Sequence, residues 1–270
     1  MCELLGMSAN VPTDICFSFT GLIRRGGETG PHKDGWGISF YEGKGYREFR
    51  DPEPSIDSEI ARLIKNYPIK SKAVISHIRQ ANVGGICLEN THPFSREMWG
   101  RYWSYAHNGQ LKDAKRRFPA SFYLPVGTTD SEQAFCWLLA QLRLNFTDQC
   151  AIDPMGKALH GWCEQLREQG VFNMLLSNGD YLFVYCSTKL SWITRRAPFG
   201  KAHLSDVEVT VDFKEETTPD DVVTVIATQP LTDNEDWHTM QAGELIVFRD
   251  GEVVVRHLSE QEQTKTDQPG

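Results

Sequence analysis

The last third of the chain contains a run of short β-strands that no helix interrupts. After Gly170 the stretches FNMLLSN, YLFVYCST, LSWITRR, VVTVIATQ, ELIVFRDG and EVVVRH follow one another, with turn residues between them. Two helical patterns, TDSEQAFCWLLAQLRLNF and PMGKALHGWCEQLREQG, come directly before this run. Because strands and helices occur in blocks and not in strict alternation, the sequence favours an α+β fold and disfavours a doubly wound parallel sheet. Two antiparallel sheets packed face to face, with helices outside, would account for the many half-buried strands.

The first half of the chain mixes the two kinds of element. CELLGMS predicts a first strand, and residues 13–25 predict a helix that stops at Gly26-Gly27. WGISFYE and GYREFRD bracket a Gly-rich turn and predict a hairpin, and residues 58–67 predict a short amphipathic helix. KAVISHIR and RYWSYAHNG predict two further strands, the second ending on Asn-Gly.

Charge and hydropathy narrow the class of protein. The 270 residues include 28 Lys and Arg against 36 Asp and Glu, a net charge of -8, which argues against a nucleic-acid surface. No apolar run approaches the roughly 20 residues of a membrane helix, and the N-terminus lacks the pattern of a signal peptide. We therefore expect a cytoplasmic protein that binds no membrane. No repeat or long linker divides the chain, so we expect one domain over residues 2–251 and a polar, flexible tail over residues 259–270.

The cysteines do not form a recognisable framework. There are seven, an odd number, with no C-x-x-C pair, so neither a disulfide scaffold nor a zinc site is expected. Cys2 stands out by its position. It could be a small apolar residue that starts a strand. Alternatively, removal of Met1 would give Cys2 a free α-amine, a base with a pKa of about 7.7–8.0, beside its own thiol.

Three further stretches have both a structural and a chemical interpretation. In GPHKDGWGISF the glycines permit an unusual loop or allow the backbone to approach a ligand closely. In SHIRQAN, His77 and Arg79 share one face of a strand end, and Arg79 could bind a carboxylate or form a surface ion pair. His92, in ENTHPF, could be a base, a metal ligand or a residue with a structural hydrogen bond. We favour the structural role, because no second histidine or carboxylate lies at metal-binding spacing.

Two more stretches could serve a reaction. In AHNGQL, Asn108-Gly109 is first of all a turn signal, but the Asn108 amide and the Gly109 N–H could also stabilise an oxyanion. In TTDSE, Asp130 at a helix start could cap the helix or bind a substrate ammonium group.

The order of these motifs resembles that of the class II glutamine amidotransferases, a family of N-terminal-nucleophile hydrolases. Behind Cys2 the chain carries RG…DGWGI, HIR, THPF, HNGQL and TDSE in the family's order, and MCELLGM and ENTHPF are similar to stand-alone bacterial members. The resemblance covers the chain from Cys2 to about Gly251. It implies a four-layer αββα sandwich, in agreement with the strand-rich pattern.

The resemblance also implies roles for individual residues. Cys2 matches the nucleophile, with its own α-amine as base, and Asn108 and Gly109 match the oxyanion pair. Arg79 matches the residue that holds the α-carboxylate of glutamine, and Asp130 matches the one that holds its α-ammonium group.

Two positions match the family pattern less closely. Arg25 in RRGG aligns with a family arginine near the thiol, in a loose register. Asn82-Val83 stands where many members have Thr-His or Ser-Thr, which changes the contacts at one edge of the substrate pocket.

Several functions remain open at this point. One is a glutaminase that forms a γ-glutamyl thioester hydrolysed by water and passes ammonia to a separate subunit, since 270 residues leave no room for the synthase domain of the larger enzymes. Another is a γ-glutamyl amidohydrolase that acts on a glutathione-like compound without ammonia transfer. A third is a non-catalytic protein that binds an amino acid. A metal enzyme is disfavoured, and the expected chemistry requires no cofactor.

Overall fold

The computed structural model describes residues 2–67, 69–81, 84–213 and 218–259, and within them the apolar stretches pair into two large antiparallel sheets. The first has the strand order β13-β9-β12-β1-β4-β2-β3 and the second the order β15-β14-β8-β7-β6-β5. The strands of the first sheet are β1 (Glu3–Asp14), β2 (Trp36–Glu42), β3 (Gly45–Asp51), β4 (Lys70–Ile78), β9 (Ser191–Arg196), β12 (Val222–Ala227) and β13 (His238–Thr239). Those of the second are β5 (Phe94–Met98), β6 (Arg101–Leu111), β7 (Gly170–Ser177), β8 (Leu182–Cys186), β14 (Glu244–Arg249) and β15 (Glu252–Leu258).

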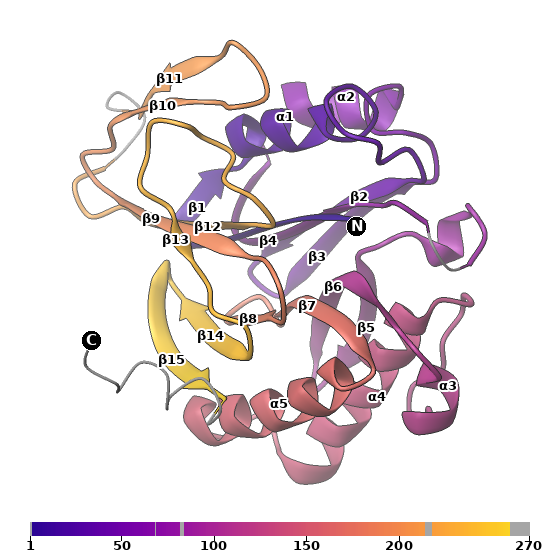
Figure 1. Ribbon diagram of the computed structural model, residues 1–270. Helices are drawn as coiled ribbons and strands as arrows, with labels where there is room; N and C mark the ends of the chain where they lie inside the picture. The colour runs from indigo at the N-terminus through magenta and orange to yellow at the C-terminus, as the bar shows by residue number, and fades with distance from the viewer. Residues whose placement is uncertain (1, 68, 82–83, 214–217, 260–270) are drawn as a thin grey trace, which may run out of the picture.

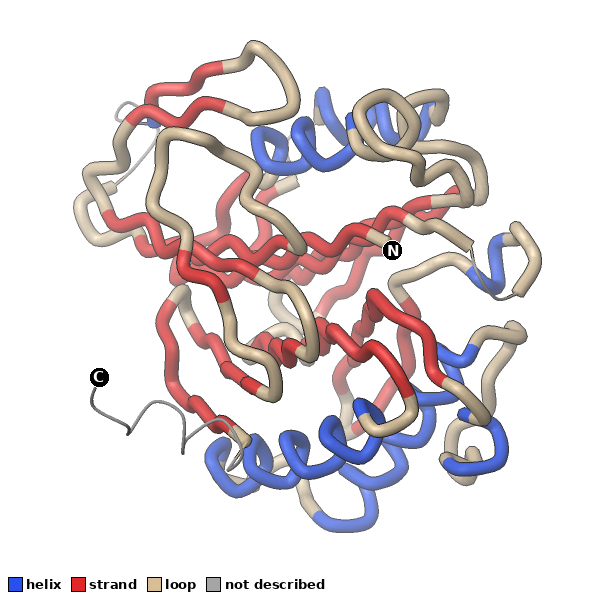
Figure 2. The backbone as a smooth tube through the Cα atoms, viewed as in Figure 1, coloured by secondary structure: helices blue, strands red, loops and turns tan. Residues whose placement is uncertain are grey.

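Helices cover the outer face of each sheet, so the molecule has four layers (Figures 1 and 2). The helices are α1 (Cys16–Arg24), α2 (Glu59–Asn66), α3 (Ala114–Arg117), α4 (Asp130–Asn145), α5 (Ile152–Arg167) and a 3-10 turn at Leu88–Asn90. α1 and α2 pack on the first sheet, and α4 and α5 on the second. A small pair of strands, β10 (Lys201–His203) and β11 (Thr210–Asp212), lies beyond the first sheet. None of the helices in these residue ranges is long and apolar enough to cross a bilayer.

Residues 3–9 of β1 are buried on both faces, because the second sheet covers one face of the first sheet and α1 and α2 cover the other. Leu4 packs against the second sheet, whereas Leu5 and Met7 pack toward α1 and α2. Polar contacts also join the two sheets: the Ser39 and Ser104 hydroxyl groups lie 2.9 Å apart. The layer between the sheets is therefore largely apolar with a few buried polar contacts, and β1 begins at one end of that layer.

The α+β class, the antiparallel sheets and the four-layer arrangement are confirmed. The first predicted helix begins later than expected, at Cys16, because β1 continues to Asp14. Asp14 still marks the start, since its carboxylate accepts a hydrogen bond from the Cys16 N–H at 2.6 Å. The short strands β5, β10, β11 and β13 were not predicted. Of the expected tail only Ser259 lies within the described residues, and the domain boundaries stay a prediction.

Candidate active site

The Cys2 sulfur lies at the start of β1, beside the end of the neighbouring strand β4 in the first sheet. β1 pairs with β4 so that Glu3 is opposite Ile78, which brings Cys2 beside the residues that follow β4. Its Sγ accepts a hydrogen bond from the Gln80 backbone N–H at 3.3 Å and lies 3.4 Å from the Gln80 carbonyl oxygen. Burial raises the pKa of the Cys2 thiol, and the Gln80 hydrogen bond partly opposes this shift by favouring the thiolate.

A small cavity of about 30 Å³ opens beside this sulfur. Five separate segments of the chain contribute to its wall: the residue before β1, the residues after β4, the segment before β5, the end of β6 and the start of α4. The lining residues are Cys2, Arg79, Gln80, Ala81, His92, His107, Gly109, Gln110, Thr129, Asp130 and Ser131. The cavity therefore brings together five of the residues singled out from the sequence: Cys2, Arg79, His92, Gly109 and Asp130.

Asn108 and Gly109 do not form a turn, so the turn interpretation of Asn-Gly is wrong. Both lie inside β6, where they are opposite Asn173 and Phe172 of β7. A Cβ atom on Gly109 would lie 1.8 Å from the Val171 carbonyl oxygen, so the close approach of the two strands requires glycine here. Asn108 lies next to the cavity wall, on the same face of β6 as Ala106, which packs between the sheets.

The Asn108 side chain is completely buried, and neither its nitrogen nor its oxygen has a hydrogen-bond partner in the part of the chain that the structure describes. A buried amide without partners is costly, and such groups in native proteins are rare. Asn108 thus keeps donor capacity inside the protein, next to a cavity that contains a thiol.

Sequence reasoning missed Asn173, which lies directly opposite Asn108. Its Nδ2 donates to the Asn108 carbonyl oxygen at 3.2 Å and to the Thr188 hydroxyl at 2.9 Å. Its Oδ1 accepts from the backbone N–H groups of Ser187 at 3.0 Å and Thr188 at 3.1 Å. Asn173 therefore fixes the backbone of Asn108 to the turn after β8. No local pattern in FNMLLSN signals these contacts, because the partners are distant in sequence.

The DGWG stretch shapes the cavity through its backbone and one carboxylate. The Asp34 Oδ2 accepts a hydrogen bond from the Ala81 N–H at 2.7 Å, and the Arg79 N–H donates to the Gly35 carbonyl at 2.8 Å. The guanidinium group of Arg79 donates to the Gly85 carbonyl oxygen at 3.0 Å. The backbone of this stretch therefore lies against the segment that carries Arg79, and its expected approach to a ligand stays a prediction.

Asp130 is not the cap of its helix. The N-cap of α4 is Thr129, whose hydroxyl accepts a hydrogen bond from the Glu132 N–H at 3.2 Å. One oxygen of Asp130 accepts a hydrogen bond from the Leu111 N–H at 2.6 Å, which ties α4 to the end of β6. The Asp130 carboxylate thus lines the cavity from a fixed position.

Three buried histidines surround this region, and burial keeps all of them neutral. It lowers the pKa of His77 to about 3, and it lowers the pKa values of His92 and His107 as well. The rings of His77 and His92 are 4.2 Å apart, and neither has a hydrogen bond of normal geometry to a described residue. His107 has both nitrogens engaged, with the Ser131 hydroxyl at 2.8 Å and the Val171 carbonyl at 3.0 Å. A histidine that resists protonation is a poor general base.

Arg25 does not line the cavity. Its guanidinium group is held by Asp206, with nitrogen–oxygen distances of 2.9 and 2.7 Å, by Glu3 at 3.1 Å and by the Pro230 carbonyl at 2.8 Å. Arg25 therefore fixes the side chain of Glu3, the residue after Cys2, and does not itself face the cavity beside the thiol. Asn82, the other position with a loose match, lies outside the described residues.

Comparisons with known proteins identify the family of the chain. A model of the family described as class II glutamine amidotransferases matches residues 1–270. The chain is 62% identical to the YafJ protein of Escherichia coli strain K12 over 256 residues, which are 94% of this chain and all of that protein. It is 46% identical to a protein of Haemophilus influenzae over 254 residues, 94% of this chain and 86% of that protein.

Solved structures give the same result. The crystal structure of a predicted glutamine amidotransferase from Pseudomonas aeruginosa superposes with a TM-score of 0.77 at 59% identity, covering 94% of this chain and 100% of that one. A phosphoribosylpyrophosphate amidotransferase from Bacillus subtilis, at 14% identity, shares the fold with a TM-score of 0.62 over 95% of this chain and 49% of that one. The chain belongs to the class II glutamine amidotransferases, enzymes that act on an amide.

Proposed function

We propose that the protein hydrolyses the γ-amide of glutamine or of a γ-glutamyl compound, with Cys2 as the nucleophile. The observation that carries this proposal is the cavity that joins the Cys2 sulfur to Arg79, Gly109 and Asp130. A thiol, an oxyanion donor, a cation and a carboxylate in one small space match the groups of a γ-glutamyl amino acid.

The base in this mechanism is the α-amine of Cys2 after removal of Met1. The surrounding histidines are unsuited to the role, since His77, His92 and His107 have lowered pKa values. An α-amine has a pKa of about 7.7–8.0, near the pH at which a base is most effective. It takes the proton of the thiol, and the N–H of Gln80 at 3.3 Å favours the resulting thiolate.

The thiolate attacks the γ-carbonyl carbon, and the negative charge that develops on the carbonyl oxygen is stabilised by the Asn108 amide and the Gly109 N–H. The buried Asn108 side chain supports this role, because its donor has no other described partner to give up. The amine of Cys2 then protonates the departing ammonia or amine. Water attacks the γ-glutamyl thioester, which releases glutamate and restores the thiol.

Arg79 and Asp130 recognise the two charged groups of the amino acid, its α-carboxylate and its α-ammonium group. Both are fixed by hydrogen bonds to backbone groups, Arg79 to Gly85 and Asp130 to Leu111, so they act as rigid contacts. A space of about 30 Å³ holds one or two water molecules, so glutamine binding widens the cavity. We place the reaction in the cytoplasm, where a thiol nucleophile stays reduced.

The decisive experiment compares wild-type protein with Cys2→Ala, and with Cys16→Ala as the matched control. Cys16 is also a half-buried free cysteine, but it is the first residue of α1, beyond the far end of β1, and its pKa is raised to about 12 by burial and by Asp14. We expect Cys2→Ala to lose turnover and labelling by a diazoketone analogue of glutamine, and Cys16→Ala to keep both. Mass spectrometry of the purified protein should find a chain that begins at Cys2. Turnover by Cys2→Ala, or by protein that keeps Met1, would contradict the mechanism.

A panel of substrates separates the remaining alternatives. Ammonia release from glutamine as the fastest reaction supports a glutaminase, and an ammonia-accepting partner subunit would then be sought by co-purification. Faster cleavage of γ-glutamyl amides with larger leaving groups supports a γ-glutamyl amidohydrolase. Glutamine binding without labelling of Cys2 would identify a non-catalytic binding protein.

A further inference from the structure

Two polar residues on the wall of the cavity beside Cys2, His107 and Ser131, have no part in the proposed reaction. Ser131 follows Asp130 in the first turn of α4, and His107 lies in β6 directly before Asn108. Both are almost completely buried, with exposed fractions of 1% for His107 and 5% for Ser131. Their side chains therefore adjoin whatever ligand fills this cavity.

The hydrogen bonds of His107 determine which of its ring nitrogens carries the proton. Its Nε2 lies 3.0 Å from the Val171 carbonyl oxygen, and its Nδ1 lies 2.8 Å from the Ser131 hydroxyl oxygen. A carbonyl oxygen only accepts hydrogen bonds, so Nε2 is the nitrogen that donates. Burial lowers the pKa of His107 and keeps the ring neutral, which leaves Nδ1 without a proton. Nδ1 is therefore an acceptor.

This tautomer of His107 determines what the Ser131 hydroxyl can offer to a ligand. The hydroxyl has a single proton, and it donates that proton to Nδ1 of His107. The oxygen keeps its two lone pairs, but it has no second proton to donate. The residue next to Asp130 thus contributes to the cavity wall an oxygen that can only accept hydrogen bonds from a ligand.

An α-ammonium group in this cavity needs more acceptors than Asp130 alone provides. It has three N–H donors, and a donor that stays unpaired in a closed site is costly. One oxygen of Asp130 already accepts a hydrogen bond from the Leu111 N–H at 2.6 Å. The hydroxyl oxygen of Thr129, also on the wall, is occupied by the Glu132 N–H at 3.2 Å. Ser131 carries the further acceptor closest in sequence to Asp130.

We propose that Ser131 is a second acceptor for the α-ammonium group of the substrate, and that His107 positions it by accepting the proton of its hydroxyl group. Asp130 and Ser131 together make the cavity selective for a γ-glutamyl compound that has a free α-amine over the same compound without it. This inference rests on the proposed function, because it assigns a substrate group to the cavity beside Cys2.

The test compares L-glutamine with glutaramate, which lacks only the α-ammonium group. Their dissociation constants are measured by calorimetry with Cys2→Ala protein, which should bind both compounds without turnover. Adding Ser131→Ala should weaken L-glutamine binding by roughly 10- to 100-fold, the usual effect of losing a hydrogen bond to a charged group, and should leave glutaramate binding nearly unchanged. A purely structural role of Ser131 would affect both compounds alike.

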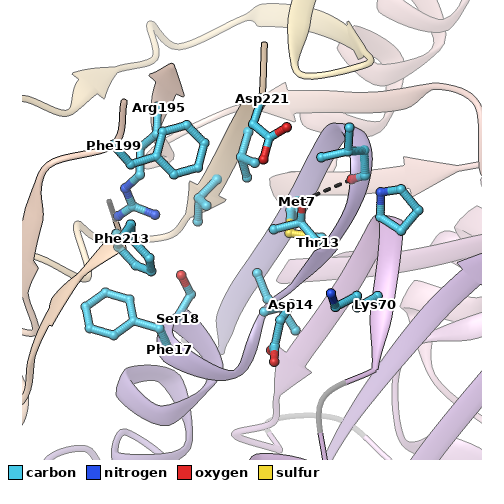
Figure 3. Close-up of a pocket in the computed structure, with 15 residues that line it drawn as sticks. Met7, Thr13, Asp14, Phe17, Ser18, Lys70, Arg195, Phe199, Phe213 and Asp221 are labelled. Carbon is cyan, nitrogen blue, oxygen red and sulfur yellow. Dashed lines mark hydrogen bonds between the residues drawn. The ribbon is translucent and has the colours of Figure 1, made fainter. Parts of the chain in front are cut away.

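The matched control is Ser18→Ala in the same Cys2→Ala background. Ser18 is also a buried serine in the first turn of a helix, 4% exposed near the start of α1. It lines a separate cavity of about 490 Å³ at the far end of β1, where Figure 3 shows it beside Phe17. This variant should keep the affinity of the Cys2→Ala parent for both compounds.

The positioning role of His107 has a spectroscopic test. A long-range ¹H–¹⁵N NMR spectrum at neutral pH should show the ring proton of His107 on Nε2, with its signals assigned by their loss in His107→Gln. The inference is overturned if the proton is on Nδ1, or if Ser131→Ala weakens both compounds equally or neither. Those outcomes leave the proposed function intact, since turnover and labelling of Cys2 test it separately. Failure of the wild type to cleave any γ-glutamyl amide would overturn the proposed function and this inference with it.

Discussion

Asn108 of β6 and Asn173 of β7 are directly opposite each other on neighbouring strands. We predict that truncation of Asn108 lowers activity with little loss of stability, whereas truncation of Asn173 lowers stability. Both are fully buried asparagines, but Asn173 makes several hydrogen bonds and the Asn108 side chain makes none to a described residue. Asn108→Ala should lower kcat for amide hydrolysis by about 10²–10³, or about 2.7–4 kcal/mol, which is the usual effect of removing one oxyanion donor. Its effect on stability should be small.

The expected stability changes follow from the hydrogen bonds. Removal of the unpaired Asn108 amide relieves a desolvation cost of about 1–3 kcal/mol, which offsets the packing that is lost, so the free energy of unfolding should change by less than about 1 kcal/mol. Asn173→Ala leaves the N–H groups of Ser187 and Thr188 without their acceptor. At about 1–3 kcal/mol for the buried Ser187 N–H, and little for the N–H of the exposed Thr188, which can bind water, the free energy of unfolding should fall by roughly 1–3 kcal/mol.

The assay pairs urea unfolding with steady-state ammonia release from glutamine, or cleavage of the best γ-glutamyl amide, at a temperature where both variants are folded. The reasoning is refuted if Asn108→Ala keeps more than about a third of the wild-type kcat. It is equally refuted if Asn108→Ala is destabilised as much as Asn173→Ala, since Asn108 would then be a structural residue.

Three other predictions address charge. Arg25→Ala should lower the free energy of unfolding by about 3–5 kcal/mol in urea, because it leaves two largely buried carboxylates unpaired, whereas the exposed neighbour variant Arg24→Ala should cost under about 1 kcal/mol. Since burial lowers the pKa of His77 to about 3 from its ordinary value of about 6.5, the unfolded chain binds a proton in this range that the folded one does not. Stability is therefore lost as the pH falls from about 6.5 toward 3, and in His77→Phe the pH slope of the unfolding free energy should be shallower by up to about 1.4 kcal/mol per unit; an unchanged slope contradicts the neutral ring. Asp130→Asn should raise KM for glutamine about tenfold or more in steady-state kinetics and change kcat less, as loss of a charged hydrogen bond to the substrate ammonium group predicts; an unchanged KM would remove Asp130 from substrate binding.

Features determined by local interactions were predicted well. The TDSE stretch at residues 129–132 marks the start of α4, although the cap is Thr129 and not Asp130, and the Gly-rich turn after Glu42 marks the β2–β3 hairpin. Both depend on hydrogen bonds within a few residues, which a sequence pattern can reveal. The block order of strands and helices likewise indicated the layered α+β fold.

Features determined by distant partners were not predicted. Asn108-Gly109 has the composition of a turn, yet it lies inside β6 and pairs with β7. Glycine is required at position 109 because a Cβ atom there would collide with the Val171 carbonyl oxygen. The positions of Arg25 and Asn173 depend on partners such as Asp206 and Thr188, whose proximity appears only once the sheets are formed. Tertiary contacts overrode the local preference in each case.

The pairing of β1 has a consequence for the order of events during synthesis. β1 lies between β4 and β12, and its partner residues Leu5 and Ala227 are separated by most of the chain. The β1–β12 pairing cannot form until the ribosome has released nearly all of the polypeptide, and contacts of this range form slowly. One edge of β1 therefore stays unpaired through most of translation, and the first sheet is completed only when the last strands arrive.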